Sequence, residues 1–159
     1  MGDGRNRCPV VNINTIGGFP MVQLIVGNKG KGKTTQLLEK VNREIKEIAG
    51  NIVYLDKNTK HMYELNNKVR LIDVSQYMIE SSSEFMGFVC GIISQDHDLQ
   101  QMYFDNFLKI ACLEGQDMVP VINKLEKLSE TYEVDFILSI SMDESQIPAD
   151  LKDKIIVSL

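Results

Sequence analysis

The stretch MVQLIVGNKGKGKTT, residues 21–35, decides the fold because it joins an uncharged apolar run to a loop rich in glycine and lysine. Residues 21–26 carry no charge, which is typical of a strand buried on both faces of a parallel sheet. From Lys33 to Ile48, apolar residues recur at helical spacing with charged residues between them, and Gly50 supplies a stop. The stretch therefore predicts a buried strand, a tight loop and an amphipathic helix in direct succession.

The loop between this strand and this helix has the composition needed to hold phosphate groups. Its three glycines, Gly27, Gly30 and Gly32, allow a tight turn in which backbone N–H groups point inward. The positive end of the helix dipole and the Lys33 ammonium add positive potential, and the Thr34 hydroxyl is a suitable ligand for Mg²⁺. We therefore predict that the loop binds a nucleoside triphosphate. The residues expected to contact it are Gly27, Asn28, Lys29, Gly30, Lys31, Gly32, Lys33, Thr34 and Thr35.

Strand and helix patterns alternate along the rest of the chain. The predicted strands are residues 51–56, 68–74, 101–105, 134–141 and 154–158, and the predicted helices are 81–94 and a segment from about 117. Ser81 and Glu84 have the spacing of a capping box at the start of a helix. This alternation predicts an α/β fold of three layers, in which helices cover both faces of a mainly parallel sheet of about five strands.

Composition excludes several classes of protein. The chain has 159 residues, of which 43% are hydrophobic and 25% charged, and this fits one domain, expected over residues 21–159. A formal net charge of −5 argues against an extended nucleic-acid surface. No apolar run approaches the roughly 20 residues that span a bilayer. We expect a cytoplasmic protein that binds neither membrane nor nucleic acid, with a poorly ordered extension over residues 1–20.

The glycine-rich loop, with the strand before it and the helix after it, resembles the P-loop of the P-loop NTPase superfamily. The resemblance to this superfamily extends from Met21 to Leu159. The chain is similar to small single-domain bacterial ATP-binding proteins, some labelled twitching-motility ATPases, which carry motifs like the stretch Lys68–Asp73. The resemblance implies a P-loop fold of the RecA and AAA-like branch, with ATP and Mg²⁺ as cofactors. In that branch an extra strand lies between the strand before the loop and the strand that carries the metal-side carboxylate.

The resemblance also implies catalytic roles for Lys33 and for carboxylates at strand ends. The superfamily has an apolar strand that ends in an Asp, which holds Mg²⁺ together with Thr34. Asp105 fits this role, and Asp56 is the alternative. If Asp105 holds the metal, Asp56 is a candidate catalytic carboxylate, although a simple strand-terminal cap is the favoured explanation.

A polar residue at the end of the strand 134–141 is implied to sense the γ-phosphate. Ser139 and Ser141 both occupy such positions. The same resemblance raises the question of turnover, because many members have a Glu directly after the metal-side Asp and this chain has Asn106. Neither Arg43, on a charged helix face, nor Arg70, on an edge-strand candidate, is placed as an arginine finger. A protein partner or a second copy would then be needed for full stimulation.

The sequence thus leaves two main functions open. One is a slow or partner-stimulated Mg²⁺-dependent ATPase, and the other is a nucleotide-bound regulator or adaptor without appreciable turnover. A GTPase is the third alternative, but the nearest base-reading fragment, Asn123–Glu126, falls inside a helical pattern. His61 and His97 stand at no metal-ligand spacing from each other or from Cys, and are predicted to be loop or surface residues.

Overall fold

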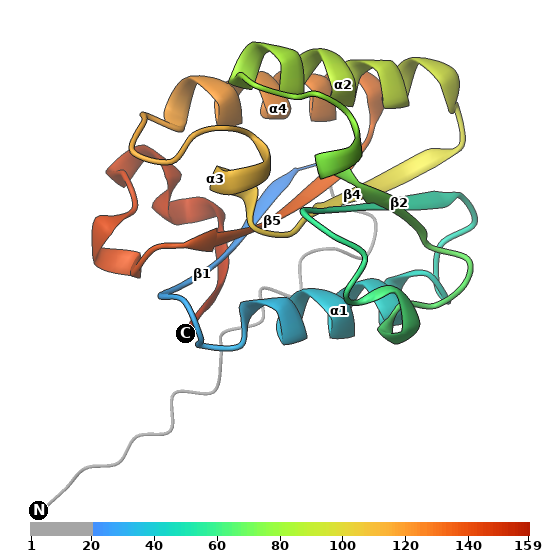
Figure 1. Ribbon diagram of the computed structural model, residues 1–159, viewed down its shortest axis with the longest axis horizontal. Helices are drawn as coiled ribbons and strands as arrows, with labels where there is room; N and C mark the ends of the chain where they lie inside the picture. The colour runs from blue at the N-terminus through green and yellow to red at the C-terminus, as the bar shows by residue number, and fades with distance from the viewer. Residues whose placement is uncertain (1–20) are drawn as a thin grey trace, which may run out of the picture.

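The computed structural model describes residues 21–159, which form one α/β sheet structure with helices on both faces (Figure 1). Helix α1 (Lys33–Glu44) covers one face of the sheet. Helices α2 (Ser82–Gln95) and α4 (Val119–Tyr132) cover the other. The predicted three-layer arrangement is compatible with this structure, while the extension expected over residues 1–20 lies outside the described residues.

The sheet has six strands in the order β3-β2-β4-β5-β1-β6, and every pair of neighbouring strands is parallel. The strands are β1 (Val22–Gly27), β2 (Asn51–Asp56), β3 (Arg70–Asp73), β4 (Leu99–Phe104), β5 (Asp135–Ser141) and β6 (Ile155–Ser158). The predicted parallel sheet is confirmed, and a strand forms at each of the six segments predicted from the sequence, although the sheet was expected to have about five. The edge strands β3 and β6 have four residues each and are incompletely buried.

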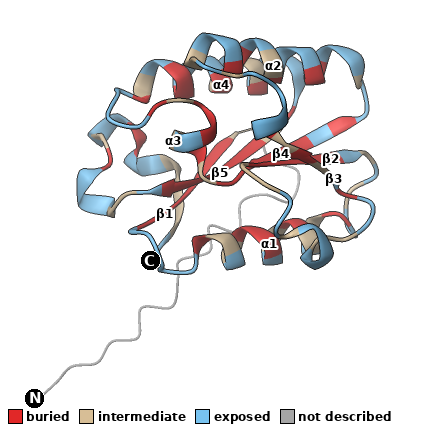
Figure 2. Cartoon of the chain, viewed as in Figure 1, coloured by how far each residue is buried: buried red, intermediate tan, exposed pale blue. Residues whose placement is uncertain are grey.

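Apolar side chains fill the space on both faces of the sheet, which explains the uncharged runs in the sequence. In β1 all six residues are buried. Leu24 and Val26 pack on the side of α2 and α4, whereas Ile25 packs on the side of α1. Figure 2 shows the buried residues concentrated in the strands and on the helix faces that point toward them. A strand with this pattern has no solvent-facing side, so it carries no alternation of polar residues.

Helix boundaries follow local hydrogen bonding. Ser81 caps α2, because its Oγ accepts a hydrogen bond from the Glu84 N–H (3.1 Å), as the sequence predicts. The Glu84 carboxylate accepts from the Glu80 N–H (2.8 Å), one residue earlier than in a capping box. Helix α1 ends at Glu44, four residues before Ile48, because the Lys46 N–H bonds back to the Arg43 carbonyl and tightens the last turn.

The remaining helices are short. Helix α3 (Phe107–Ile110) is a single turn that the sequence analysis did not predict. Four 3₁₀ helices span Met62–Glu64, Val74–Gln76, Glu144–Gln146 and Ala149–Lys154. None of the helices in residues 21–159 combines the length and the apolar character that crossing a membrane requires.

Candidate functional site

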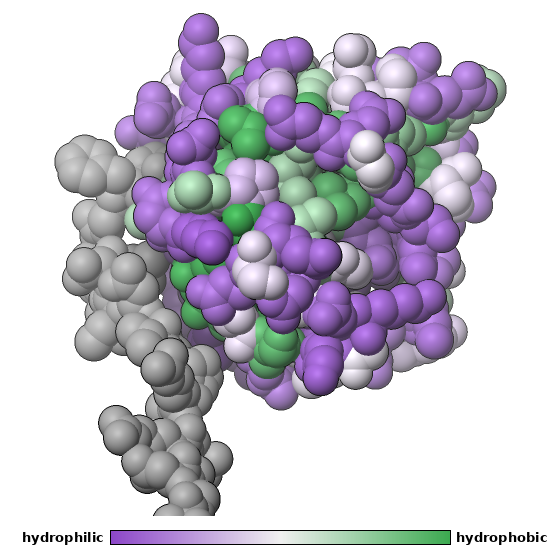
Figure 3. Space-filling view, turned by 90° about the vertical axis from the view of Figure 1, so that its left-hand side faces the viewer, coloured by the Kyte–Doolittle hydropathy of each residue, from purple (hydrophilic) through white to green (hydrophobic). Residues whose placement is uncertain are grey.

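A pocket of about 440 Å³ opens where the parallel strands reach their carboxyl ends. The loop after β1, the loop after β2 and the ends of β4 and β5 line it. Figure 3 views the molecule from this side, where hydrophilic side chains surround small hydrophobic areas. Open parallel sheets bind ligands at this edge, since loops from several strands converge there. The volume is within the range of small-ligand sites, about 300–1,000 Å³.

The glycine-rich loop enters the pocket between β1 and α1. Gly30 (φ +86°) and Gly32 (φ +90°) have left-handed backbones, and both line the pocket. Any other residue at either position would strain the backbone because of its positive φ, although an added Cβ would meet no neighbouring atom. Gly32 is the N-cap residue of helix α1, which has no side-chain cap and no acidic residue in its first turn. Its N-terminal N–H groups and its dipole therefore favour an anion at this position.

Lys33 lies over this loop and is buried, with 7% of its surface exposed. Its Nζ donates a hydrogen bond to the Asn28 carbonyl oxygen (3.0 Å). Burial lowers the pKa of Lys33, and the nearby Asp105 charge opposes this shift. The one positive side chain buried in the described part of the pocket is thus held at the loop that carries the glycines.

Asp105, directly after β4, is buried and accepts three hydrogen bonds. Its Oδ1 accepts from the Thr34 hydroxyl (3.2 Å) and the Ser139 hydroxyl (2.9 Å), and its Oδ2 accepts from the Tyr54 hydroxyl (3.0 Å). Strand β5, which carries Ser139, lies between β1 and β4 and so bridges the glycine-rich loop to this carboxylate. The residues Thr34 and Asp105, which the sequence analysis assigned to Mg²⁺, are in direct contact.

Asp56, the last residue of β2, is the second buried carboxylate of the pocket. Its Oδ1 accepts a hydrogen bond from the Lys57 N–H (2.6 Å). Burial, and then the charge of Asp105, raise the pKa of Asp56 to about 6. The site therefore brings two carboxylates together in a place where holding both as anions is costly.

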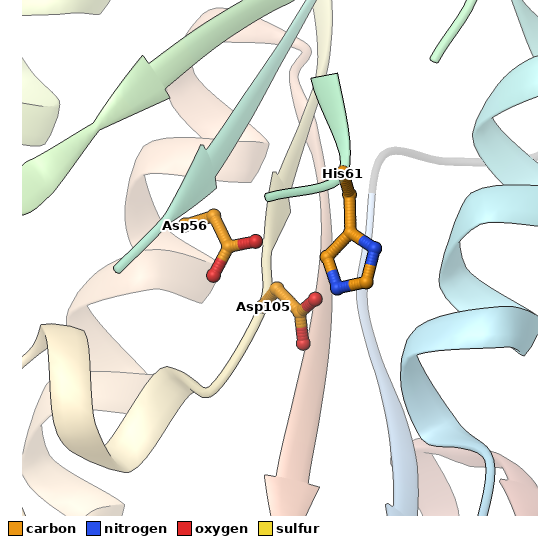
Figure 4. A group of neighbouring side chains, drawn as sticks. All are labelled: Asp56, His61 and Asp105. Carbon is orange, nitrogen blue, oxygen red and sulfur yellow. The ribbon is translucent and has the colours of Figure 1, made fainter. Parts of the chain in front are cut away.

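His61 completes the pocket and lies in the loop after β2, as predicted. A ligand atom from His61, one from Asp56 and one from Asp105 all lie within 4.8 Å of one another. Figure 4 shows the three side chains converging from the ends of β2 and β4 and from the loop after β2. The loop returns over the strand ends, so residues at unhelpful sequence spacing meet in space. His97 is exposed, as predicted.

The loop after β2 is held against α1 by one asparagine. The Asn42 Nδ2 donates to the Glu64 carbonyl oxygen (2.7 Å), and its Oδ1 accepts from the Asn66 N–H (2.8 Å). His61 precedes these contacts in the loop, and its Nδ1 lies 2.5 Å from the Glu64 Oε2. These contacts fix the segment that brings the imidazole into the pocket. Nothing in the local sequence marks Asn42 for this role.

The other predicted site residues are distributed around the pocket. Lys29 lines it and is exposed, and Gly27 is the buried end of β1. Lys31 and Thr35 are exposed, so their side chains contribute less than the sequence analysis expected. Ser141 lines the pocket but is exposed, and Ser139 alone of the two contacts Asp105.

Tyr54 is a site residue that the sequence analysis missed. It lies in β2, is fully buried, and its hydroxyl contacts Asp105. Burial and the Asp105 charge raise its pKa, so the hydroxyl stays a donor. A tyrosine in an otherwise apolar buried strand was the available signal, since a buried hydroxyl needs a partner.

Ser139 is expected to matter for stability through two hydrogen bonds. It donates to Asp105 and accepts from the Asn106 N–H (2.9 Å), so Ser139→Ala leaves two buried groups without this partner. We expect the free energy of unfolding to fall by about 1–3 kcal/mol in urea denaturation. The matched control is Ser141→Ala, on the same strand but exposed, with an expected change within about 0.5 kcal/mol. Equal losses in the two variants would contradict the assigned hydrogen bonds.

Comparison with known proteins adds no relative to this description. No protein-family model matches the chain, and no curated protein matches it either. The geometry of the pocket is therefore the ground on which a function is assigned.

Proposed function

We propose that this chain is a P-loop ATP-binding protein and a Mg²⁺-dependent ATPase of low turnover. One observation carries the proposal: the Thr34 hydroxyl, in the first turn of α1 after the glycine-rich loop, contacts the buried Asp105 at the end of β4. A phosphate-binding loop and a metal-side carboxylate are thus joined in one site. The position of β5 between β1 and β4 is the strand order that the RecA and AAA-like branch implies, and it supports the same proposal.

The loop fits a chain of phosphates on three counts. Gly30 and Gly32 hold the backbone in conformations that turn N–H groups toward one side. The uncapped start of α1 adds the positive end of a twelve-residue helix. Lys33 supplies a buried ammonium at the same loop, where it would bind the β- and γ-phosphates in place of the Asn28 carbonyl oxygen.

The donor set beside the loop fits Mg²⁺. Thr34 and Asp105 offer a hydroxyl and a carboxylate oxygen, the ligand type that Mg²⁺ prefers. Bound there, Mg²⁺ would neutralise phosphate charge and orient the phosphates. Ser139 and Tyr54 orient the Asp105 carboxylate through their hydrogen bonds. The buried hydroxyls thus prepare the carboxylate for a cation before any ligand arrives.

Low turnover follows from the residues around Asp105. Asn106 stands where many related ATPases have Glu, and its amide cannot act as a base. Its backbone is left-handed (φ 52°), a conformation that Asn tolerates better than Glu does. No Arg lines the described pocket, since Arg43 and Arg70 are exposed elsewhere. A protein partner or a second copy of the chain would then have to supply the missing charge.

The alternative function is a nucleotide-bound regulator, and Asn106 is again the observation that favours it. The hypothesis that Asp56 polarises the attacking water stays a prediction. A GTPase has less support, because Asn123–Glu126, the fragment nearest to a guanine-reading motif, lies within helix α4. ATP is therefore the nucleotide that we propose.

Titration calorimetry with ATP and Mg²⁺, followed by measurement of phosphate release, tests the proposal. We expect saturable binding of one ATP per chain and slow phosphate release. Asp105→Asn is the turnover control, because it keeps the shape of the side chain but removes the charge that faces the cation. Binding with release no faster than in Asp105→Asn would favour the regulator. If the chain binds neither ATP nor GTP, the proposal is wrong.

A further inference from the structure

We propose that Asp56, His61 and Asp105 hold a divalent transition-metal ion directly, without any nucleotide. This site goes beyond the proposed ATP and Mg²⁺ function, since neither Asp56 nor His61 is needed to bind a P-loop nucleotide. The three ligand atoms lie within 4.8 Å of one another at the carboxyl ends of β2 and β4 (Figure 4). Two carboxylates and one imidazole face a common point.

The Asp56 carboxylate indicates that this point is built for a cation. Asp56 is 2% exposed, and only its Oδ1 accepts a hydrogen bond. Within residues 21–159 its Oδ2 accepts no hydrogen bond and is open to the pocket. Two carboxylates buried side by side repel each other, and a cation between them offsets this cost. Since Asp56 lines the pocket and points toward Asp105 and His61, its Oδ2 is available as a ligand to a cation placed among them.

The His61 ring is oriented as metal-binding histidines are. Its Nδ1 lies 2.5 Å from the Glu64 Oε2, so the proton is held on Nδ1 and the lone pair stays on Nε2. Figure 4 shows a ring nitrogen of His61 directed at the Asp105 carboxylate. A carboxylate behind the imidazole fixes the tautomer and raises the basicity of the ligand nitrogen. Asn42 in turn anchors the Glu64 backbone to α1, so the ring is supported from outside the pocket.

The ligand set selects the class of ion. Carboxylates suit Mg²⁺, Ca²⁺ and Mn²⁺, and the added imidazole ligand suits transition-metal ions such as Fe²⁺ and Zn²⁺. Such ions bind oxygen and nitrogen at about 2.0–2.2 Å, so ligand atoms on opposite sides of an ion are roughly 4.2 Å apart. The three ligand atoms lie within 4.8 Å of one another, so the side chains must rotate toward a common centre to share one ion. Three protein ligands leave coordination positions open to water or to a phosphate oxygen.

The test uses Mn²⁺ alone as the probe, because it discriminates against the exposed thiol of Cys90. Electron paramagnetic resonance of free Mn²⁺ is expected to show one ion bound per nucleotide-free chain. His61→Ala should weaken binding at least about tenfold, and Glu64→Gln, which removes only the outer carboxylate, about tenfold. His97→Ala is the matched control, with an expected affinity equal to that of the unmodified chain. Thermal unfolding of each variant shows that the fold is retained.

Two results would overturn the metal site. One is the absence of stoichiometric Mn²⁺ binding to the unmodified chain, and the other is an unchanged affinity in His61→Ala. A separate titration of the unmodified chain with ATP and Mg²⁺ distinguishes this site from the proposed ATP function. If the chain binds Mn²⁺ through His61 but does not bind ATP, the metal site is supported and the nucleotide proposal is refuted. If it binds ATP but not Mn²⁺ alone, the nucleotide proposal is supported and the metal site is refuted.

Discussion

Replacing Lys33 with alanine is expected to weaken the binding of ATP in the presence of Mg²⁺ by about 2–3 kcal/mol, roughly 30- to 150-fold. The ammonium is the buried cation of the glycine-rich loop and already occupies a hydrogen-bonding position there, at the Asn28 carbonyl oxygen. Charge-assisted hydrogen bonds to phosphate are stronger than neutral ones, particularly where water is excluded. Titration calorimetry of both proteins under the same conditions measures the difference.

A second lysine variant shows whether the effect is specific. Lys46 is exposed, lies after the end of α1 and is remote from the pocket, so Lys46→Ala removes one positive charge without touching the loop. We expect its ATP affinity to stay within about twofold of the unmodified chain, since exposed charges are screened by solvent and salt. If the two variants lose ATP affinity equally, Lys33 acts only through the net charge of the protein. The proposal that the glycine-rich loop and Lys33 bind the phosphates is then refuted.

Replacing Phe104 with alanine is expected to lower the free energy of unfolding by about 3–5 kcal/mol. Phe104 is fully buried at the carboxyl end of β4, directly before Asp105. Its ring packs against Phe85, Phe107 and Phe136, with centroid distances of 5.4, 6.1 and 5.7 Å. Removing it leaves a cavity under the site, because the other three rings come from three different elements and cannot all move inward.

Urea denaturation measures this loss, and Phe104→Leu provides the comparison. Leucine keeps much of the volume, so we expect a loss of about 1–1.5 kcal/mol for that variant. Similar losses for leucine and alanine would show that the four rings do not form a close-packed cluster. Because Asp105 follows Phe104 in the chain, the alanine variant should also bind ATP more weakly than the leucine variant.

The regions that the sequence predicts well are those buried on both sides. The run before Gly27 and the charged, periodic helix after it have unambiguous patterns, and β1 and α1 form there. The edge strands β3 and β6 were also predicted, but each is shorter than the segment expected from the sequence. The end of α1 and the single turn of α3 depend on hydrogen bonds that no periodicity encodes.

Some residues of the candidate site could likewise be predicted from the sequence, and others could not. The sequence predicts that Thr34 and Asp105 hold one cation, and the two side chains are in contact. Thr34 follows the glycine-rich loop motif, and Asp105 stands at the end of an apolar strand. His61 and Tyr54 were not assigned to the site, since they reach it through a loop reversal and through the side of a strand. Sequence spacing describes neighbours along one element, whereas these contacts join different elements. Strand order, which brings them together, is a property of the whole chain.

The place of β1 in the sheet, between β5 and the edge strand β6, has a consequence for how the protein is made. Within residues 21–159 its strand partners are β5 and β6, which begin at Asp135 and Ile155. While a ribosome is still producing the segment between β1 and β5, the apolar strand before the glycine-rich loop has no neighbour on either edge. Pairings between distant parts of a chain form slowly, and unpaired strand edges promote aggregation in the meantime. We therefore expect the pocket proposed for ATP to be completed among the last steps of folding, and a ligand bound there would report that the whole sheet is assembled.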